Sequence, residues 1–191
     1  MVLANVLQLL NIAHKLAVAL VLSISKSLKK LVLYTTRPIR AEEEDGKQYY
    51  FVDDKKLKEF QEKGCVIEAR AYHTVHGIWT YFTADDGQVN LDASDYLGIG
   101  TLESYVKMRE YYGEEALCPI YIEVEDGERL ARALNRERSQ KTPRYEEMCR
   151  RFLADQEDFS EEKIAAAGIK KRFQNIDLEK CVEEIAQYIK G

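Results

Sequence analysis

Glycine is absent from the first 45 residues of this 191-residue chain, and the first glycine is Gly46. A loop that cradles phosphate groups with its backbone N–H groups needs closely spaced glycines, so residues 1–45 contain no loop of this kind. Proline is scarce as well, with three in the whole chain, and no low-complexity tract or repeat is present. The length therefore predicts one sizeable domain that carries inserted parts, without a flexible linker.

A surplus of basic residues is also missing. The formal net charge is −5 and the pI is about 5.4, which argues against a nucleic-acid-binding protein. The cysteines are scattered, with no CxxC motif and no cluster with histidine: Cys65, Cys118, Cys149 and Cys181. This pattern is typical of reduced thiols in a cytoplasmic protein, and it indicates neither a disulfide framework nor a metal site.

Long hydrophobic runs are missing too, although residues 1–25 are rich in Leu, Val and Ala. The longest unbroken apolar run is Leu16–Leu22, far short of the roughly 20 residues that span a bilayer. Polar side chains interrupt the segment mostly at spacings of three and four, which predicts a partly buried amphipathic helix over residues 1–25. An interfacial membrane helix is the alternative, and it is disfavoured because the polar face carries one lysine, Lys15.

The remainder of the chain alternates between patterns typical of strands and of helices. We expect strands at 31–33, 65–72, 74–82, 96–102, 119–124 and 169–174, and helices at 53–64, 103–112, 127–138, 145–157 and 177–189. Such alternation predicts an α/β fold in which a three-layer parallel sheet is covered by helices on both faces. The two adjacent strands within 65–82 predict a small inserted β-rich subdomain.

Two arginines stand three residues apart in the loop that follows the first of these strands. Pro38 restricts its own φ angle and disfavours helix at Arg37, so Arg37 and Arg40 are presented together on a constrained loop. Paired guanidinium groups are common ligands of phosphate. A solvated surface loop with two basic residues is the alternative, and the order of the motifs that follow favours the phosphate site.

That order resembles the guanylate kinase family of P-loop nucleoside monophosphate kinases. The motifs are Thr35-Thr-Arg-Pro-Ile-Arg40, Asp45-Gly-Lys-Gln-Tyr-Tyr-Phe-Val52, the strand Val66-Ile-Glu68, arginine-rich segments and an asparagine before the final helix. The resemblance implies phosphoryl transfer from ATP to GMP with Mg²⁺, in cytoplasmic purine metabolism, with no nucleic-acid partner and no membrane. It divides the chain into an atypical segment, 1–29, and a kinase-like domain, 30–191, with an insert at about 36–95 and a lid at about 136–146.

The resemblance also assigns roles to single residues in the GMP half of the site. Arg37, Arg40 and Tyr49 match the residues that hold the GMP phosphate. Glu68 matches the carboxylate that reads guanine. Chemistry supports this role, because a carboxylate accepts hydrogen bonds from the ring N–H and the exocyclic amine of guanine together, whereas adenine offers no such donor pair. The alternative for Glu68 is an ordinary solvent-facing strand residue.

In the ATP half, the resemblance places Arg136 and Arg138 in the lid and Arg151 near the transferred phosphoryl group, where cations neutralise developing charge. For Arg150 we expect an intrahelical ion pair with a neighbouring carboxylate. Asn175 matches an asparagine near the ATP adenine. The resemblance assigns no residue of the chain as a metal ligand.

Four departures from the family pattern limit these assignments. Leu33 stands where the family has a serine that helps hold guanine, His76 replaces a tyrosine, and Gly98 with Gly100 replaces an acidic strand end. His76 is a candidate ligand of GMP or a structural histidine. The fourth departure is the missing P-loop, which removes the residues that would bind ATP and Mg²⁺.

Two explanations of the missing loop remain, a lost ATP site or residues 1–29 that are not the natural N-terminus. The sequence thus indicates a guanylate kinase-like phosphotransferase that is inactive or very weak as written. A non-catalytic module that binds GMP or a phosphorylated protein segment is the alternative.

Overall fold

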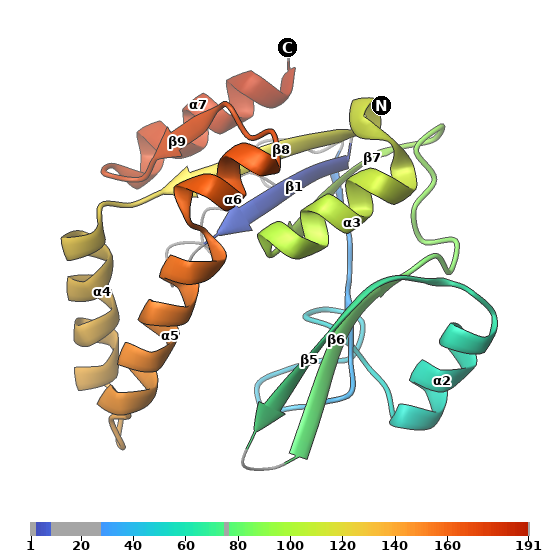
Figure 1. The fold of residues 1–191 in the computed structure, drawn as a ribbon, viewed down its shortest axis with the longest axis horizontal. Coiled ribbons are helices and arrows are strands. Elements are labelled where there is room, and N and C mark those ends of the chain that lie inside the picture. The colour runs from blue at the N-terminus through green and yellow to red at the C-terminus, as the bar shows by residue number, and fades with distance from the viewer. Residues whose placement is uncertain (1–2, 9–27, 75–76, 191) are drawn as a thin grey trace.

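The protein is described by a computed structural model, which defines residues 3–8, 28–74 and 77–190 (Figure 1). The strands of the main sheet all run parallel, in the order β2 (Leu28–Lys30), β7 (Asp95–Gly100), β1 (Leu3–Gln8), β8 (Leu117–Glu123) and β9 (Arg172–Gln174). Parallel strands need crossover connections, and helices supply those from β7 to β8 and from β8 to β9. This arrangement confirms the α/β fold class.

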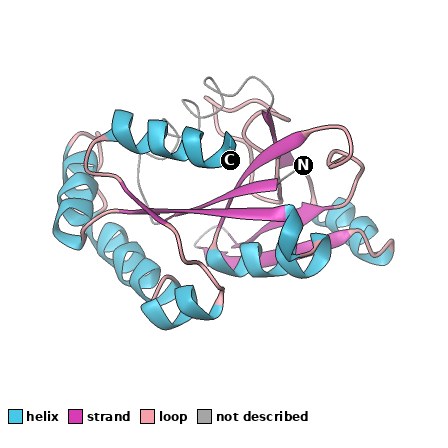
Figure 2. Ribbon diagram, turned by 90° about the horizontal axis from the view of Figure 1, so that it is seen from above, coloured by secondary structure: helices cyan, strands magenta, loops and turns pink. Residues whose placement is uncertain are grey.

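Helices cover both faces of the main sheet (Figures 1 and 2). α3 (Leu102–Tyr112) and α6 (Glu161–Ala166) lie on one face, where Tyr96 and Tyr121 are buried. α7 (Leu178–Lys190) lies on the other face and packs on Leu97 and Ile120. Consecutive residues of β7 and β8 therefore pack into the hydrophobic cores on opposite faces of the sheet, because side chains alternate between the two faces along a strand. The three-layer prediction is confirmed.

The N-terminal strand corrects one prediction. The helix expected over residues 1–25 is wrong for Leu3–Gln8, which form β1 between β7 and β8. The apolar pattern of so short a stretch does not separate helix from buried strand, and two parallel neighbours together satisfy the backbone of the central position. The rest of the expected helix, residues 9–25, lies outside the described residues.

A second sheet forms the inserted β-rich unit. Its order is β4 (Tyr50–Phe51), β3 (Tyr34–Thr35), β6 (Gly77–Ala84) and β5 (Val66–Thr74), and α2 (Asp54–Glu62) packs on it. Phe82 is fully buried at the centre of a small core with Tyr34 and Leu57. The side chain of Asp53 caps α2 by accepting a 2.8 Å bond from the amide of Lys56, which gives the helix its start.

The strand predicted at 31–33 is instead the crossing between the two sheets. The amide of Leu31 still donates to the Leu97 carbonyl of the main sheet at 2.9 Å, whereas the carbonyl of Leu33 accepts from Tyr50 of the insert, also at 2.9 Å. Between these residues the backbone changes its hydrogen-bonding partner from the main sheet to the insert. Leu31 and Val32 are buried at this crossing, which fixes where the loop with Arg37 leaves the core.

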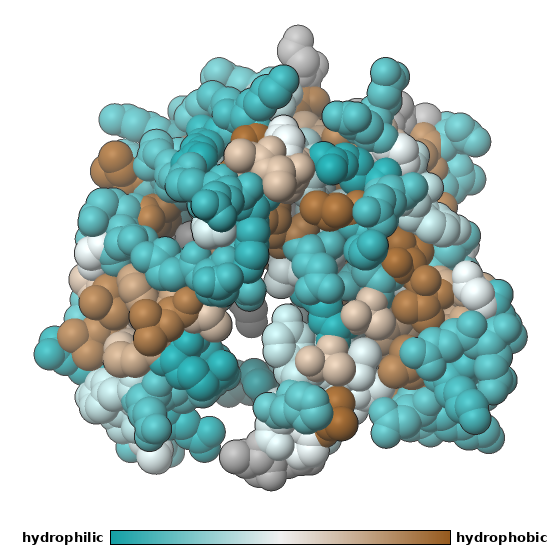
Figure 3. Space-filling model, viewed as in Figure 1, coloured by the Kyte–Doolittle hydropathy of each residue, from teal (hydrophilic) through white to brown (hydrophobic). Residues whose placement is uncertain are grey.

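α4 (Asp126–Arg138) and α5 (Tyr145–Asp158) form a helical hairpin beside the main sheet. The buried carboxylate of Glu137 holds the connecting turn, because it accepts from Gln140 Nε2 and from the amide of Arg144, both at 3.0 Å. Figure 3 shows the molecule hollowed between this hairpin and the insert. Within the described ranges, no helix is long and apolar enough to cross a membrane.

Candidate functional site

Arg37 lies in the loop after β3 with 4% of its surface exposed. Its guanidinium group donates to both oxygens of Glu43, with Nη1–Oε2 at 2.7 Å and Nη2–Oε1 at 2.5 Å, and Nη1 also donates to the Pro38 carbonyl at 3.0 Å. The rings of Tyr49 and Phe51 flank it, with centroids 5.4 and 5.1 Å from Cζ. Bidentate pairing and stacking together hold Arg37 in one orientation.

Glu43 connects the two arginines that the sequence predicted as phosphate ligands. Besides Arg37, its carboxylate accepts a 3.0 Å bond from the amide of Arg40. The hydrogen bonds from Arg37 lower the pKa of Glu43 to about 2. Arg40 itself is exposed at the rim of the insert. The structure therefore brings Arg37 and Arg40 into one loop, with the carboxylate of Glu43 on the buried guanidinium and Arg40 open to solvent.

The ion pair between Arg37 and Glu43 makes the stability of the insert depend on pH. Because the folded-state pKa of Glu43 is depressed, its stabilising contribution is present above the ordinary carboxyl pKa of 4.5 and is lost as the pH falls toward about 2. We expect the melting temperature of the wild type to drop more steeply between pH 4.5 and pH 2 than that of Glu43→Gln. Thermal melts over this range measure the difference, and parallel curves for the two proteins would contradict it.

Tyr49 lies beside Arg37 and packs edge-to-face on Tyr81, with ring centroids 5.5 Å apart. Burial raises the pKa of Tyr49, so its hydroxyl stays protonated and remains a donor at neutral pH. Sequence reasoning missed Tyr81, which lies on β6 opposite Thr35 and Arg70 of the neighbouring strands. The alternation along β6 was the signal, because it places Tyr81 and Thr83 on one face.

Glu68 lies on β5 with a buried carboxylate, so it is not the solvent-facing residue of the alternative interpretation. Arg70 Nε donates to its Oε2 at 2.9 Å and Arg70 Nη2 reaches Oε1 at 3.4 Å. Thr83 Oγ1 donates to Oε1 at 2.7 Å. Arg70 was also missed, although its spacing of two from Glu68 on a strand predicts the same face. His76 lies outside the described residues.

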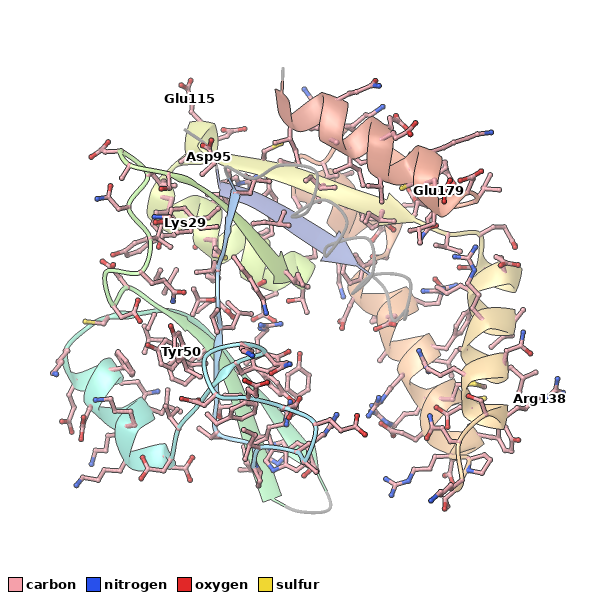
Figure 4. All side chains as sticks on the ribbon, turned by 180° about the vertical axis from the view of Figure 1, so that it is seen from behind. Lys29, Tyr50, Asp95, Glu115, Arg138 and Glu179 are labelled. Atoms are coloured by element: carbon pink, nitrogen blue, oxygen red, sulfur yellow. The ribbon has the colours of Figure 1, made fainter. Side chains whose placement is uncertain are left out.

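The helical hairpin of α4 and α5, which carries the predicted lid and transfer-site arginines, lies across the hollow from the insert (Figure 3). The side chain of Arg136 is 20% exposed and its Nε lies 3.9 Å from Glu137 Oε1, whereas Arg138 points outward, away from the insert (Figure 4). Arg150 and Arg151 both pair with Glu147 of α5. The intrahelical ion pair expected for Arg150 is confirmed, and Arg151 shares its carboxylate.

Asn175 follows β9 and is 2% exposed. Its amide donates to the Glu123 carbonyl at 2.9 Å and its own carbonyl accepts from Arg132 Nη2 at 3.2 Å, while its side-chain Nδ2 has no hydrogen-bond partner. A cavity of about 440 Å³ lies nearby, at the carboxyl end of β8, and its walls are formed by Tyr121, Glu123, Val124, Glu125, Asp126, Glu161 and Gln174.

The described residues do not show an arrangement that fits ATP with Mg²⁺, which the resemblance implies. The cavity beside β8 carries four carboxylates in its wall, and these would repel a triphosphate. The part of the chain that the structure describes contains no group of three His, Cys, Asp or Glu side chains arranged to hold a metal ion. No glycine precedes Gly46 to build an anion-binding loop. We therefore derive no chemical step through ATP.

Comparisons with known proteins give a family match and matches to solved structures. The family model described as guanylate kinase matches residues 13–84. The crystal structure of guanylate kinase from Anaplasma phagocytophilum is similar in fold, with a TM-score of 0.63 and 21% sequence identity, over 99% of this chain and 84% of that chain. No curated protein matches the sequence. The family match covers the loop of Arg37 and Arg40, Tyr49 and Glu68, and the structural match covers the whole fold.

Proposed function

We propose that this chain, guanylate kinase-like in its family match and in its fold, binds GMP on the insert and forms the acceptor half of an ATP:GMP phosphotransferase. The observation that carries the proposal is the joint placement of Arg37, Arg40 and Tyr49. Arg40 is exposed to a ligand in the same loop as Arg37, whose guanidinium is paired with Glu43 and lies beside the ring of Tyr49. Two cations and a hydroxyl donor in one loop region suit a phosphate with several acceptor oxygens. The missing glycine-rich loop and the acidic cavity limit the proposal to GMP binding, with phosphoryl transfer very weak or lost.

Arg40 offers a direct test, because it is exposed and its removal leaves the Arg37–Glu43 pair intact. We expect Arg40→Ala to weaken GMP binding by about 1.5–3 kcal/mol, as for other lost hydrogen bonds to a charged group. Isothermal titration calorimetry with GMP measures the effect. Lys47→Ala is the matched control, since it removes an exposed cation of the same loop that pairs with Glu44. Equal affinities in all three proteins would remove Arg40 from the phosphate site.

The alternative function is a non-catalytic module that binds a phosphorylated protein segment. The same pair of arginines favours it, because a phosphoserine carries the same acceptor oxygens as the GMP phosphate. Calorimetry with GMP and with a phosphoserine peptide separates the two. Binding of the peptide without binding of GMP would support the module, whereas binding of GMP alone would support the nucleotide site.

A further inference from the structure

The carboxylate that should read guanine is already occupied by a side chain of the same strand. Arg70 presents Nε–H and Nη2–H to the two oxygens of Glu68, at 2.9 and 3.4 Å, and Thr83 donates to one of them at 2.7 Å. The side chain of Glu68 is 2% exposed and that of Arg70 is 11% exposed. A ligand that approaches Glu68 therefore meets Arg70 first.

Arg70 offers Glu68 the same hydrogen bonds that guanine would offer. The guanine edge carries a ring N–H beside an exocyclic amine, and a guanidinium group carries two parallel N–H donors on one planar fork. A carboxylate can accept a side-on pair of this kind from one partner at a time when its remaining lone pairs are enclosed. Arg70 and guanine are thus competitors for one acceptor pair.

Arg70 is anchored from its far side as well. Its Nη1 donates at 3.0 Å to Thr101 Oγ1, and Thr101 is the N-cap residue of α3 on the main sheet. The bond joins the insert to the core of the protein, so the guanidinium is held between Glu68 and α3. If Arg70 withdraws from Glu68, it therefore loses its two hydrogen bonds to the carboxylate and the hydrogen bond to Thr101.

We propose that Arg70 is the residue that sets base selectivity, because it acts as an internal competitor that must leave Glu68 before guanine is read. This proposal rests on the proposed function, in which GMP is the ligand of the insert. While Arg70 stays in place, Arg40 is accessible to a phosphate, but the carboxylate of Glu68 cannot accept hydrogen bonds from guanine. The apparent affinity for GMP is then the intrinsic affinity multiplied by the small fraction of molecules in which Arg70 has withdrawn from Glu68.

The test compares Arg70→Met with the wild type. Methionine keeps much of the length and packing of the arginine stem but has no N–H donor. We expect the variant to bind GMP at least about tenfold more tightly, which corresponds to a competent state populated at a tenth or less in the wild type. The affinity for AMP should not rise, because adenine lacks the donor pair. Calorimetry with GMP, AMP and ribose 5-phosphate supplies the three affinities.

Further variants separate selectivity from structural damage. Glu68→Gln combined with Arg70→Met should abolish the gain in GMP affinity, because an amide presents only one acceptor oxygen. Lys107→Ala is the control, since it removes an exposed cation of α3 that pairs with Glu110 outside the site. Melting temperatures show that each variant is folded, and Arg70→Ala is the substitute if Arg70→Met does not fold. A structural role alone would change the melting temperature without changing the ratio of GMP to AMP affinity.

The outcomes are distinguishable. A GMP:AMP affinity ratio that rises in Arg70→Met and returns in the double variant supports the proposal. Binding of GMP with an unchanged or reduced ratio in Arg70→Met overturns it while leaving the proposed function intact. A wild type and variants that bind neither GMP nor ribose 5-phosphate overturn the proposed function, and with it this inference.

Discussion

Mixed with ATP, Mg²⁺ and GMP, this chain should release ADP far more slowly than the roughly 1–100 s⁻¹ that is usual for kinases. Phosphoryl transfer depends almost entirely on positioning the phosphates and neutralising their charge. Residues 1–45 contain no glycine, so no lysine of this range stands in the glycine-rich loop that holds the phosphates, and Lys15, the first lysine, is followed by Leu16. A coupled assay of ADP release measures the rate.

The positive control for this assay is a guanylate kinase that retains its glycine-rich loop, measured under the same conditions. Calorimetry with GMP on the same preparation shows whether the acceptor site is intact, so that a low rate is not confused with an unfolded protein. Turnover in the ordinary kinase range would show that this chain positions ATP by other residues, and the proposed loss of phosphoryl transfer would then be wrong.

Arg37→Ala should lower the free energy of unfolding by about 3–5 kcal/mol, the range for removing one partner of a buried ion pair. The side chains of Arg37 and Glu43 are only 4% and 13% exposed, and they form two charged hydrogen bonds. Removing the guanidinium leaves a largely buried carboxylate without its cation. Chemical denaturation monitored by circular dichroism measures the change.

Two further variants show whether the unpaired carboxylate of Glu43 causes the loss of stability. Adding Glu43→Gln to Arg37→Ala removes the unpaired charge, so the double variant should recover part of the stability. Arg40→Ala is the matched control, because Arg40 is exposed in the same loop and its removal should change stability by less than about 0.5 kcal/mol. An Arg37→Ala protein as stable as Arg40→Ala would show that the pair is not structural, and Arg37 would be left with its predicted role at the phosphate alone.

Local signals were sufficient to predict most of the main fold. Helices were expected to begin at residues 53 and 103, and α2 and α3 begin one residue away from these positions, at Asp54 and Leu102. The apolar stretches at 96–102 and 119–124 predicted two buried strands, which the structure has at Asp95–Gly100 and Leu117–Glu123. Such features depend on neighbours in the sequence, so a single chain displays them without its partners.

Other features were beyond local reasoning. Leu3–Gln8 look like part of a helix, and only pairing with β7 and β8 on both sides makes them the central strand. The short helix α6 and the two-residue strand β4 were missed, because elements of this length have too little pattern of their own. Tertiary contacts stabilise each of them.

By itself the sequence determined the class of the fold and the acceptor-site motif, through the order of Arg37, Arg40, Tyr49 and Glu68 and through the missing glycines before them. Only the tertiary structure decided which of these groups are open to a ligand. It places Glu43 on Arg37 and Arg70 on Glu68, and it leaves Arg40 exposed. The physical reason is that a buried charge needs a partner, and which side chain becomes that partner depends on strand register and loop packing.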